Sequence, residues 1–162
     1  MTIRVLAPAD APAYRALRAR ALREEPEAFS RSEPESLAEL ETRFADPERF
    51  TLGAFAPELV GFVSYAREDG AKVAHKGWLL GLYVAPEARG QGIGRGLCAE
   101  LVRRAREIPG LEQLLLGVGA GNAPAQGVYA GLGFRRYGVE PHAVKIGGRY
   151  VDEDLMALAL QP

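Results

Sequence analysis

The chain has 162 residues, of which 48% are hydrophobic and 25% are charged, as is usual for a globular protein. This length favours one domain that spans residues 1–162. Its 20 Lys and Arg residues nearly balance 21 Asp and Glu residues, so the net charge of −1 does not indicate a nucleic-acid or membrane partner.

The amino terminus, MTIRVLAPAD, has neither the basic start nor the long apolar run of a signal peptide. No apolar stretch approaches the roughly 20 residues that span a bilayer. The single cysteine, Cys98, has no partner for an internal disulfide and lies in a helical pattern beside Leu97 and Leu101. We therefore expect a cytoplasmic protein in which Cys98 packs as a small core residue.

The first third of the chain is expected to begin with one strand and one helix. The alternating segment TIRVLAP predicts a strand that ends at Pro8. Asp10 can cap the following helix, whose first turn tolerates Pro12. The predicted buried stripe of this helix consists of Tyr14, Leu17, Ala21 and Leu22.

The next segment, EEPEAFSRSEP, breaks the helical periodicity and is expected to be a loop. A second helix follows from about residue 34 to residue 44, with Leu37, Leu40 and Phe44 on one face.

The middle of the chain predicts three strands, a helix and a fourth strand. RFTLGAFAPELVGFVSYARE has the pattern of a hairpin that turns at residues 56–58, and WLLGLYVAP is a further strand that Pro86 ends. A glycine-rich segment and a helix to about Glu107 come next. LEQLLLGVGAG is then apolar on both faces, as expected of a central parallel strand.

The last third of the chain predicts one helix and two or three strands. Asn122 can cap the helix, with Pro124 in its first turn and with Gly131 and Gly133 at its end. FRRYGVE and HAVKIGGRYVDEDLMALAL are expected to be strands, the latter folded at Gly147-Gly148. This order of elements predicts an α+β fold in which a mixed sheet carries helices on both faces.

The segment RGQGIGRG, residues 89–96, directly precedes the helical pattern LCAELVRRARE. Each glycine in a helical turn costs about 0.5–1 kcal/mol relative to alanine, so four in this stretch indicate a function. A helix amino terminus offers unpaired N–H groups and roughly half a positive charge, which favour a phosphate group. We therefore expect a pyrophosphate to bind this backbone, with Arg89 and Arg95 adding charge at the rim.

Several explanations compete for this segment. A P-loop is excluded because no Gly-Lys-Ser/Thr tripeptide follows the glycines. Residues 94–99 fit the loose dinucleotide pattern G-x-G-x-x-A, but they do not directly follow a strand and lack the acidic residue expected about 20 positions later. A tight strand-to-helix turn without a ligand also remains open.

A third phosphate-binding pattern, R-x-x-G-x-G, is met by Arg89, Gly92 and Gly94 after the strand that ends in LYVAPEA. This pattern resembles the acyl-coenzyme A (CoA) signature of the GNAT superfamily of N-acyltransferases. The downstream segment NAPAQGVYAGLGF is similar to the second motif of that family: an Asn, a Tyr in the next helix, and then Gly-Phe. With the matching order of strands and helices, the resemblance covers nearly the whole chain.

The resemblance implies a mostly antiparallel, twisted sheet of about seven strands that splays between the fourth and fifth strands, in one N-acetyltransferase domain. It also implies a bulge in the fourth strand and a wedge that receives the pantetheine arm of acetyl-CoA, paired with the backbone like an added strand. The cofactor-binding residues that it implies are Leu82, Tyr83, Val84, Arg89, Gly90, Gln91, Gly92, Ile93, Gly94, Arg95 and Asn122.

Two of the matched residues have an alternative role. Asn122 matches a pantetheine contact but can equally be a helix cap. Tyr129 matches the general acid that protonates the departing CoA thiolate, although its helical spacing with Ala125, Val128 and Leu132 is also that of a core residue. The ordinary pKa of a thiol is about 8.5 and that of tyrosine is about 10, so this transfer is uphill by roughly 2 kcal/mol, a gap that an apolar cleft should narrow.

The resemblance implies direct attack by an amine in a ternary complex, and the helical position of Cys98 argues against a covalent route. The base stays open among Glu68, His75, Glu140 and His142, each of which is also explained as an ordinary surface residue. On position alone, EAFSRSEPES and Tyr150 are candidates for the acceptor side.

The expected activity is therefore acetyl transfer from acetyl-CoA to a primary amine of a small molecule or peptide, without a metal. The alternatives are a domain of the same fold that senses acyl-CoA without turnover, and a structural domain that binds no cofactor. Because family members are often dimers, a homodimer is an open expectation.

Overall fold

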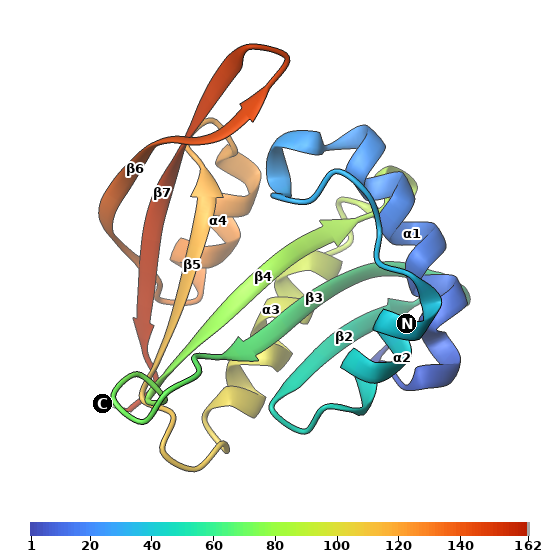
Figure 1. Cartoon of the computed structure of the whole chain (residues 1–162), viewed down its shortest axis with the longest axis horizontal. Helices are drawn as coiled ribbons and strands as arrows, with labels where there is room; N and C mark the ends of the chain where they lie inside the picture. The colour runs from blue at the N-terminus through green and yellow to red at the C-terminus, as the bar shows by residue number, and fades with distance from the viewer. Residues whose placement is uncertain (162) are drawn as a thin grey trace.

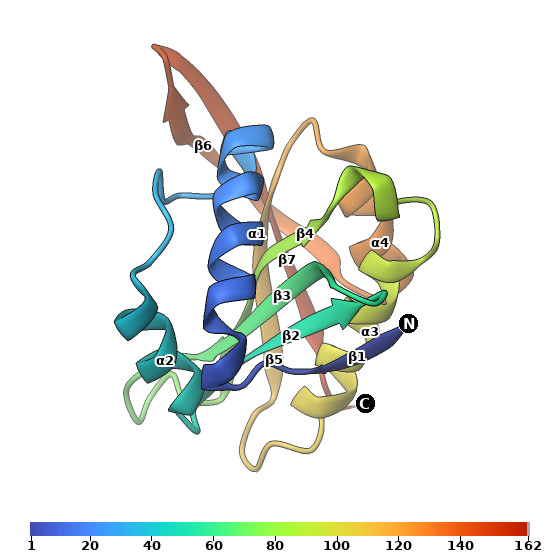
Figure 2. The ribbon, with the colours of Figure 1, turned by 90° about the vertical axis from the view of Figure 1, so that its right-hand side faces the viewer.

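The structure is a computed structural model that describes residues 1–161. The chain forms one seven-stranded sheet with helices on both faces (Figures 1 and 2). The strands are β1 (Thr2–Val5), β2 (Arg49–Phe55), β3 (Leu59–Arg67), β4 (Lys76–Val84), β5 (Gln113–Gly119), β6 (Arg135–Ile146) and β7 (Arg149–Ala159). The α-helices are α1 (Ala11–Glu24), α2 (Leu37–Ala45), α3 (Ile93–Ala105) and α4 (Ala123–Gly131), and the 3-10 turns are η1 (Pro8–Asp10), η2 (Pro26–Ala28) and η3 (Pro86–Ala88).

The strands lie in the order β1-β2-β3-β4-β5-β7-β6, and all neighbours are antiparallel except β4 and β5. This confirms the predicted mixed, mostly antiparallel sheet. The parallel pair β4–β5 extends only from Lys76↔Gln113 to Trp78↔Leu115, after which the two strands part. The predicted splay between the fourth and fifth strands is therefore present, and it divides the sheet into two halves (Figure 1).

Strand β4 contains the bulge that the resemblance implies. Ser64 pairs with Leu80 and Phe62 pairs with Tyr83, so two steps along β3 face three steps along β4. Gly81 lies in the bulge with φ +61°, a left-handed conformation that glycine adopts without steric strain. The bulge thus falls where β4 turns away from β5.

The two amino-terminal helices begin in different ways. Ser36 caps α2 by accepting a hydrogen bond from the Glu39 amide, and the Glu39 carboxylate accepts one from the Ser36 amide in return. Asp10 occupies the N-cap position of α1 as predicted, but its side chain does not cap the helix, because its carboxylate binds Arg4 and the Ala7 amide. Leu37, expected on the buried face of α2, is 43% exposed because the helix begins there, one residue after its cap.

The hydrophobic core lies on both faces of the sheet. One cluster joins α1 and α2 to β3 and β4 and includes all four residues of the predicted α1 stripe. The other joins α3 and α4 to the opposite face (Figure 2). Leu101 of α3 is fully buried in this second cluster. The sheet is thus covered by helices on both sides, as predicted from the order of elements.

We expect Leu101→Ala to lower the free energy of unfolding by about 2–5 kcal/mol, because the change leaves a cavity in a packed core. Urea unfolding measures this loss. Leu37→Ala removes the same atoms from an exposed site and should cost far less. Equal losses in the two variants would contradict this view of the core.

The carboxyl-terminal strands form a long hairpin that extends beyond the rest of the sheet (Figures 1 and 2). It turns at Gly147 and Gly148, as predicted, with φ +55° and +79°. FRRYGVE and HAVKI, expected as separate strands, are one strand with irregular pairing between Glu140 and Val144.

Candidate active site

The glycine segment forms the turn from β4 into α3. Gly90 and Gly92 have φ of +78° and +77°, and a Cβ added to either would contact nothing within 4 Å. These glycines are therefore required by the backbone conformation and not by crowding from the protein. The bare turn leaves open space in front of the backbone.

The amino terminus of α3 presents free backbone donors to this space. Gly92 is the N-cap, and its carbonyl accepts the bond from the Gly96 amide. The amides of Ile93, Gly94 and Arg95 precede that bond and have no partner within the helix. Together with the helix dipole they form a site whose chemistry suits phosphate.

A cavity of about 720 Å³ lies against this turn, and we call it the loop cavity. Among its lining residues are all the predicted cofactor contacts except Gln91, whose side chain is exposed and does not line it. The structure thus brings together Leu82, Tyr83, Val84, Arg89, Gly90, Gly92, Ile93, Gly94, Arg95 and Asn122.

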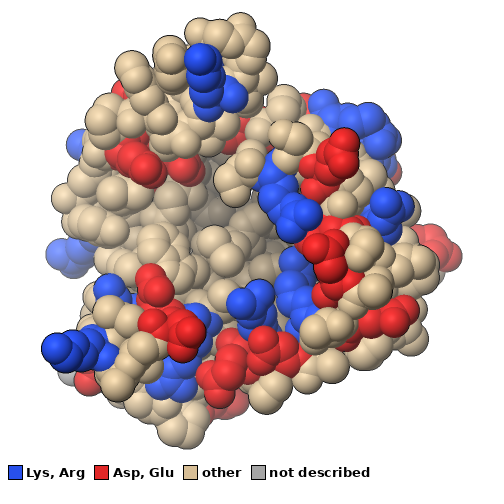
Figure 3. All heavy atoms as spheres, in the orientation of Figure 1, with Lys and Arg blue, Asp and Glu red and all other residues tan. Residues whose placement is uncertain are grey.

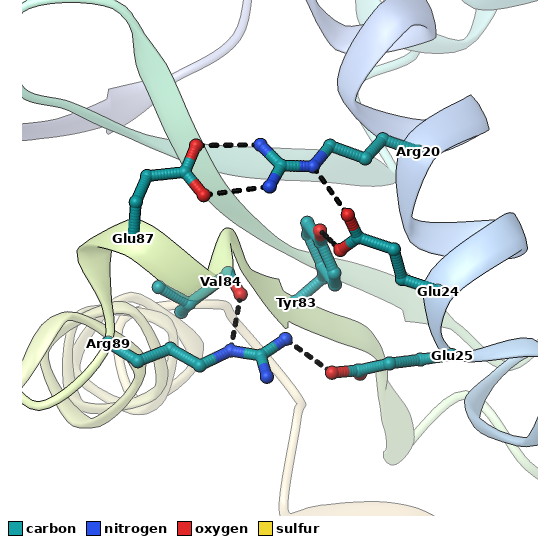
Figure 4. A network of polar contacts seen from close by, with 7 residues as sticks. All are labelled: Arg20, Glu24, Glu25, Tyr83, Val84, Glu87 and Arg89. Carbon is teal, nitrogen blue, oxygen red and sulfur yellow. Dashed lines mark hydrogen bonds and ion pairs between the residues drawn. The ribbon is translucent and has the colours of Figure 1, made fainter.

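A network of ion pairs ties the end of α1 to the loop cavity (Figure 4). The Arg89 guanidinium donates to the Val84 carbonyl over 2.8 Å and to the Glu25 carboxylate. Arg89 therefore lines the loop cavity but is held there by the protein, with its charge paired to Glu25. Sequence reasoning missed this pairing, because Glu25 lies 64 residues away along the chain.

The same network includes a second arginine and a buried tyrosine. Arg20 binds both oxygens of Glu87 at 2.6 and 2.7 Å and also binds Glu24. The Tyr83 hydroxyl donates to Glu24 over 2.6 Å, and burial raises the pKa of Tyr83 well above its usual value. These contacts fix the wall of the loop cavity from two sides.

A second cavity of about 620 Å³ lies where β4 and β5 part, and we call it the wedge cavity. Figure 3 shows the molecular surface hollowed at the centre of this face. Residues 27–31 and Glu35 line the cavity, which supports EAFSRSEPES as an acceptor-side loop. The residues that line both cavities are Glu27, Ala28, Leu82, Gly119, Asn122 and Ala125, so the two spaces adjoin.

Tyr129 lies on α4 and forms part of the wall of the wedge cavity, and it is 5% exposed. Its ring packs edge-on against Phe134, with centroids 5.9 Å apart. Its hydroxyl makes no hydrogen bond within residues 1–161, and burial raises its pKa well above the usual value. Tyr129 is thus a protonated, uncommitted donor at neutral pH.

Asn122 lies where the two cavities meet. Its Oδ1 accepts a bond of 3.3 Å from the Ala125 amide, so it is the cap of α4. The capping role is present, and the side-chain amide nitrogen is left for a further contact.

Cys98 is fully buried in the core beneath α3, and burial raises the pKa of its thiol to about 12. A thiol with this pKa is a poor nucleophile. The expectation that Cys98 packs in the core is therefore supported by its environment.

The candidate bases fall into two groups. Glu68, which accepts a hydrogen bond from the Trp78 indole, and His75, which precedes β4, do not line the wedge cavity. Glu140 does line it. Glu153 of β7 also lines it, and burial, with a smaller effect of the Glu140 charge, raises the pKa of Glu153 above its ordinary value.

Sequence analysis missed Glu153 because the segment VDED contains three consecutive acidic residues. Their order along the chain does not indicate which carboxylate points into the cavity. Only the pairing of β7 with β5 turns Glu153 toward Gly117, with Oε2 3.1 Å from where a Cβ on that glycine would lie. The remaining candidates, His142 and Tyr150, stack on each other 4.2 Å apart in the distal hairpin and do not line the cavity.

The geometry agrees with comparisons to known proteins. A family model described as "Acetyltransferase (GNAT) family" matches residues 14–134. This range contains β4, the glycine turn, β5 and α4, which line the two cavities. The chain belongs to this family. Within residues 1–161 of this GNAT protein, no cluster of His, Cys, Asp and Glu is arranged to hold a metal ion, and no helix is long and apolar enough to cross a membrane.

Individual GNAT proteins are similar to this chain over nearly its whole length. Phosphinothricin N-acetyltransferase of Alcaligenes faecalis is 32% identical over 161 residues, covering 96% of this chain and 80% of the relative. The structure of ribosomal-protein-alanine N-acetyltransferase from Brucella melitensis is 32% identical with a TM-score of 0.86, covering 98% of this chain and 99% of that one. The chain spans only 41–62% of the length of other curated acetyltransferases that it matches.

A phosphinothricin acetyltransferase of Sinorhizobium meliloti, solved in complex with acetyl-CoA, shares the fold. Its TM-score is 0.84 at 22% identity, covering 98% of this chain and 87% of that one. Acetyl-CoA is therefore bound by a GNAT protein of this architecture.

Proposed function

We propose that the chain transfers an acetyl group from acetyl-CoA to a primary amine of a small molecule or peptide. The observation that carries this proposal is the meeting of two cavities where the sheet opens. The bare amides of the glycine turn face one cavity and the Tyr129 side chain lines the other. Membership of the GNAT family and the acetyl-CoA complex of a similar fold support the same conclusion.

The residues of the loop cavity would hold the co-substrate, which supplies an activated thioester. The amides of residues 93–95 suit the pyrophosphate, and the bulged backbone at Leu82–Val84 suits the pantetheine arm. The wedge then leads the thioester toward Tyr129. Asn122, which lines both cavities, is in a position to contact the arm where it passes between them.

The residues of the wedge cavity would move the protons. Glu153 accepts a proton from the acceptor amine, directly or through water, as the amine forms the C–N bond. Tyr129 donates its proton to the sulfur as the C–S bond breaks. The products are the acetylated amine and the free thiol, after which Glu153 releases its proton to solvent and Tyr129 takes one up from solvent.

The environment of Tyr129 makes it a donor that remains protonated. Burial raises the pKa of Tyr129, and a CoA thiolate that is removed from water beside it would also have a raised pKa. The rise for Tyr129 alone would widen the pKa difference between tyrosine and thiol. The narrowing that we expected therefore requires a larger rise for the thiol.

We expect CoA at about 100 times its Kd to stabilise the protein by about 2.7 kcal/mol, a rise in Tm of several degrees. Gly92→Glu should reduce CoA affinity at least tenfold, because it places a carboxylate where the phosphate binds. Gly147→Glu is a matched control, since Gly147 is also left-handed with open space in front of it. Thermal shift and calorimetry measure both effects.

Equal CoA binding by the two variants would contradict the phosphate site. The absence of any shift with CoA and acetyl-CoA would instead favour a structural domain. Thiol release across a panel of amines then separates the enzyme from a sensor: steady release that requires one amine supports the enzyme, and tight binding without release supports the sensor.

A further inference from the structure

Arg18 is a cation without a counter-ion in the wedge cavity. It projects from α1, and its Nε is buried without a hydrogen-bond partner. Its guanidinium lies over the Phe29 ring at 4.4 Å, and its Nη1 is 3.4 Å from where a Cβ on Gly81 would lie. The charged end of Arg18 therefore sits beside the β4 bulge.

The other cations of this cavity each form an ion pair with a carboxylate, although the Nε and Nη2 of Arg43 have no hydrogen-bond partner. Arg31 and Arg43 both contact Glu35, and Arg49 contacts Asp46. Among the described residues that line the cavity, Arg18 is thus the basic side chain that forms no ion pair. Arg18 is partly buried and its Nε has no hydrogen-bond partner, so an anion that enters the cavity gains a favourable partner.

The unpaired charges stand on opposite sides of the wedge. Arg18 lies beside Gly81 of β4, and Glu153 lies beside Gly117 of β5. The last paired residues of these strands are Trp78 and Leu115, so both glycines fall just past the point where the strands part. A molecule in the wedge cavity therefore meets a cation on one side and a carboxylate on the other.

We propose that Arg18 binds an anionic group of the acceptor, so that the preferred acceptors are small amines that also carry an oxyanion, with a carboxylate as the simplest case. This inference rests on the proposed function. The guanidinium can form charge-assisted hydrogen bonds to the oxyanion, while Glu153 faces the amine. Binding at both ends orients the amine toward the thioester.

The kinetic test compares amino acids with their carboxamides: glycine, alanine, methionine, phenylalanine and glutamate, each with its amide. We expect higher kcat/KM for the carboxylate member of at least one pair. Arg18→Gln should lower that value at least tenfold and change the amide's value less than twofold. Arg18→Lys should retain part of the preference, and Arg23→Gln, which removes an exposed charge from the same helix, should retain all of it.

The binding test uses Trp78, the only tryptophan, which lines the wedge cavity. With CoA present, its fluorescence should respond to N-acetylmethionine at lower concentrations than to N-acetylmethioninamide in the wild type, but not in Arg18→Gln. Equal responses to both, or to neither, overturn the inference, as does turnover that prefers the amide. CoA-dependent stabilisation of Arg18→Gln shows that the variant is folded and tests the co-substrate site separately.

Discussion

Tyr129→Phe should lower kcat about 10²- to 10⁴-fold, because the variant cannot donate a proton to the leaving sulfur. CoA affinity should change little, since the loop cavity does not include this side chain. Stability should also hold, because the hydroxyl makes no hydrogen bond that the change would break. Steady-state thiol release and CoA calorimetry measure these quantities.

Tyr65→Phe is the matched control for this variant. Tyr65 belongs to the same core cluster as Tyr129 and is 3% exposed, and its hydroxyl is buried without a partner. It lies outside both cavities, so kcat should stay within about twofold of the wild type. A similar loss in both variants would show that Tyr129 acts through packing and would remove it from the chemistry.

Glu153→Gln should lower kcat/KM by about 10²-fold or more and should remove one ionisation from the acid side of its pH profile. In the wild type, that ionisation should lie above the ordinary range of a carboxyl group, because burial and Glu140 raise the pKa of Glu153. Glu140→Gln removes the neighbouring charge and should move the ionisation to lower pH without abolishing it. An unchanged acid limb in Glu153→Gln would assign the proton to another group.

The same substitution has a predictable effect on stability. Because folding raises the pKa of Glu153, the stability that this group contributes is fully present below its unfolded pKa. It is lost as the pH rises through its folded pKa. The Tm of Glu153→Gln relative to wild type should therefore increase with pH across this window and then level off. If Glu153→Gln is more stable than the wild type at neutral pH but less active, the Glu153 carboxylate serves catalysis and not stability.

The parts of the site that could be predicted from the sequence are those in which neighbouring residues act together. The glycine turn, Asn122 and Tyr129 lie in two short motifs, so spacing along the chain is enough to identify them. The strands and helices could be predicted for a related reason, since the burial periodicity of β5 and the stripe of α1 are local patterns.

Arg18, Glu153 and the Glu25–Arg89 pair could not be found in this way. Each reaches its place in the site only when the sheet brings distant segments together, and an arginine or glutamate on a helix or strand has the same local pattern whether it is inside or outside. The Asp10 side-chain cap was misassigned for the same physical reason, because Arg4 competes for its carboxylate across a turn.

The three-residue junction between β4 and β5 also leaves an open edge on each of these strands. Beyond that junction each strand has an unpaired edge, the kind of surface that recruits strands from other molecules. Here the two open edges face each other inside one molecule, beneath α1 and η2 on one side and α4 on the other. We therefore expect a narrow, extended ligand to reach these edges more readily than a strand of a second protein that carries its own sheet behind it.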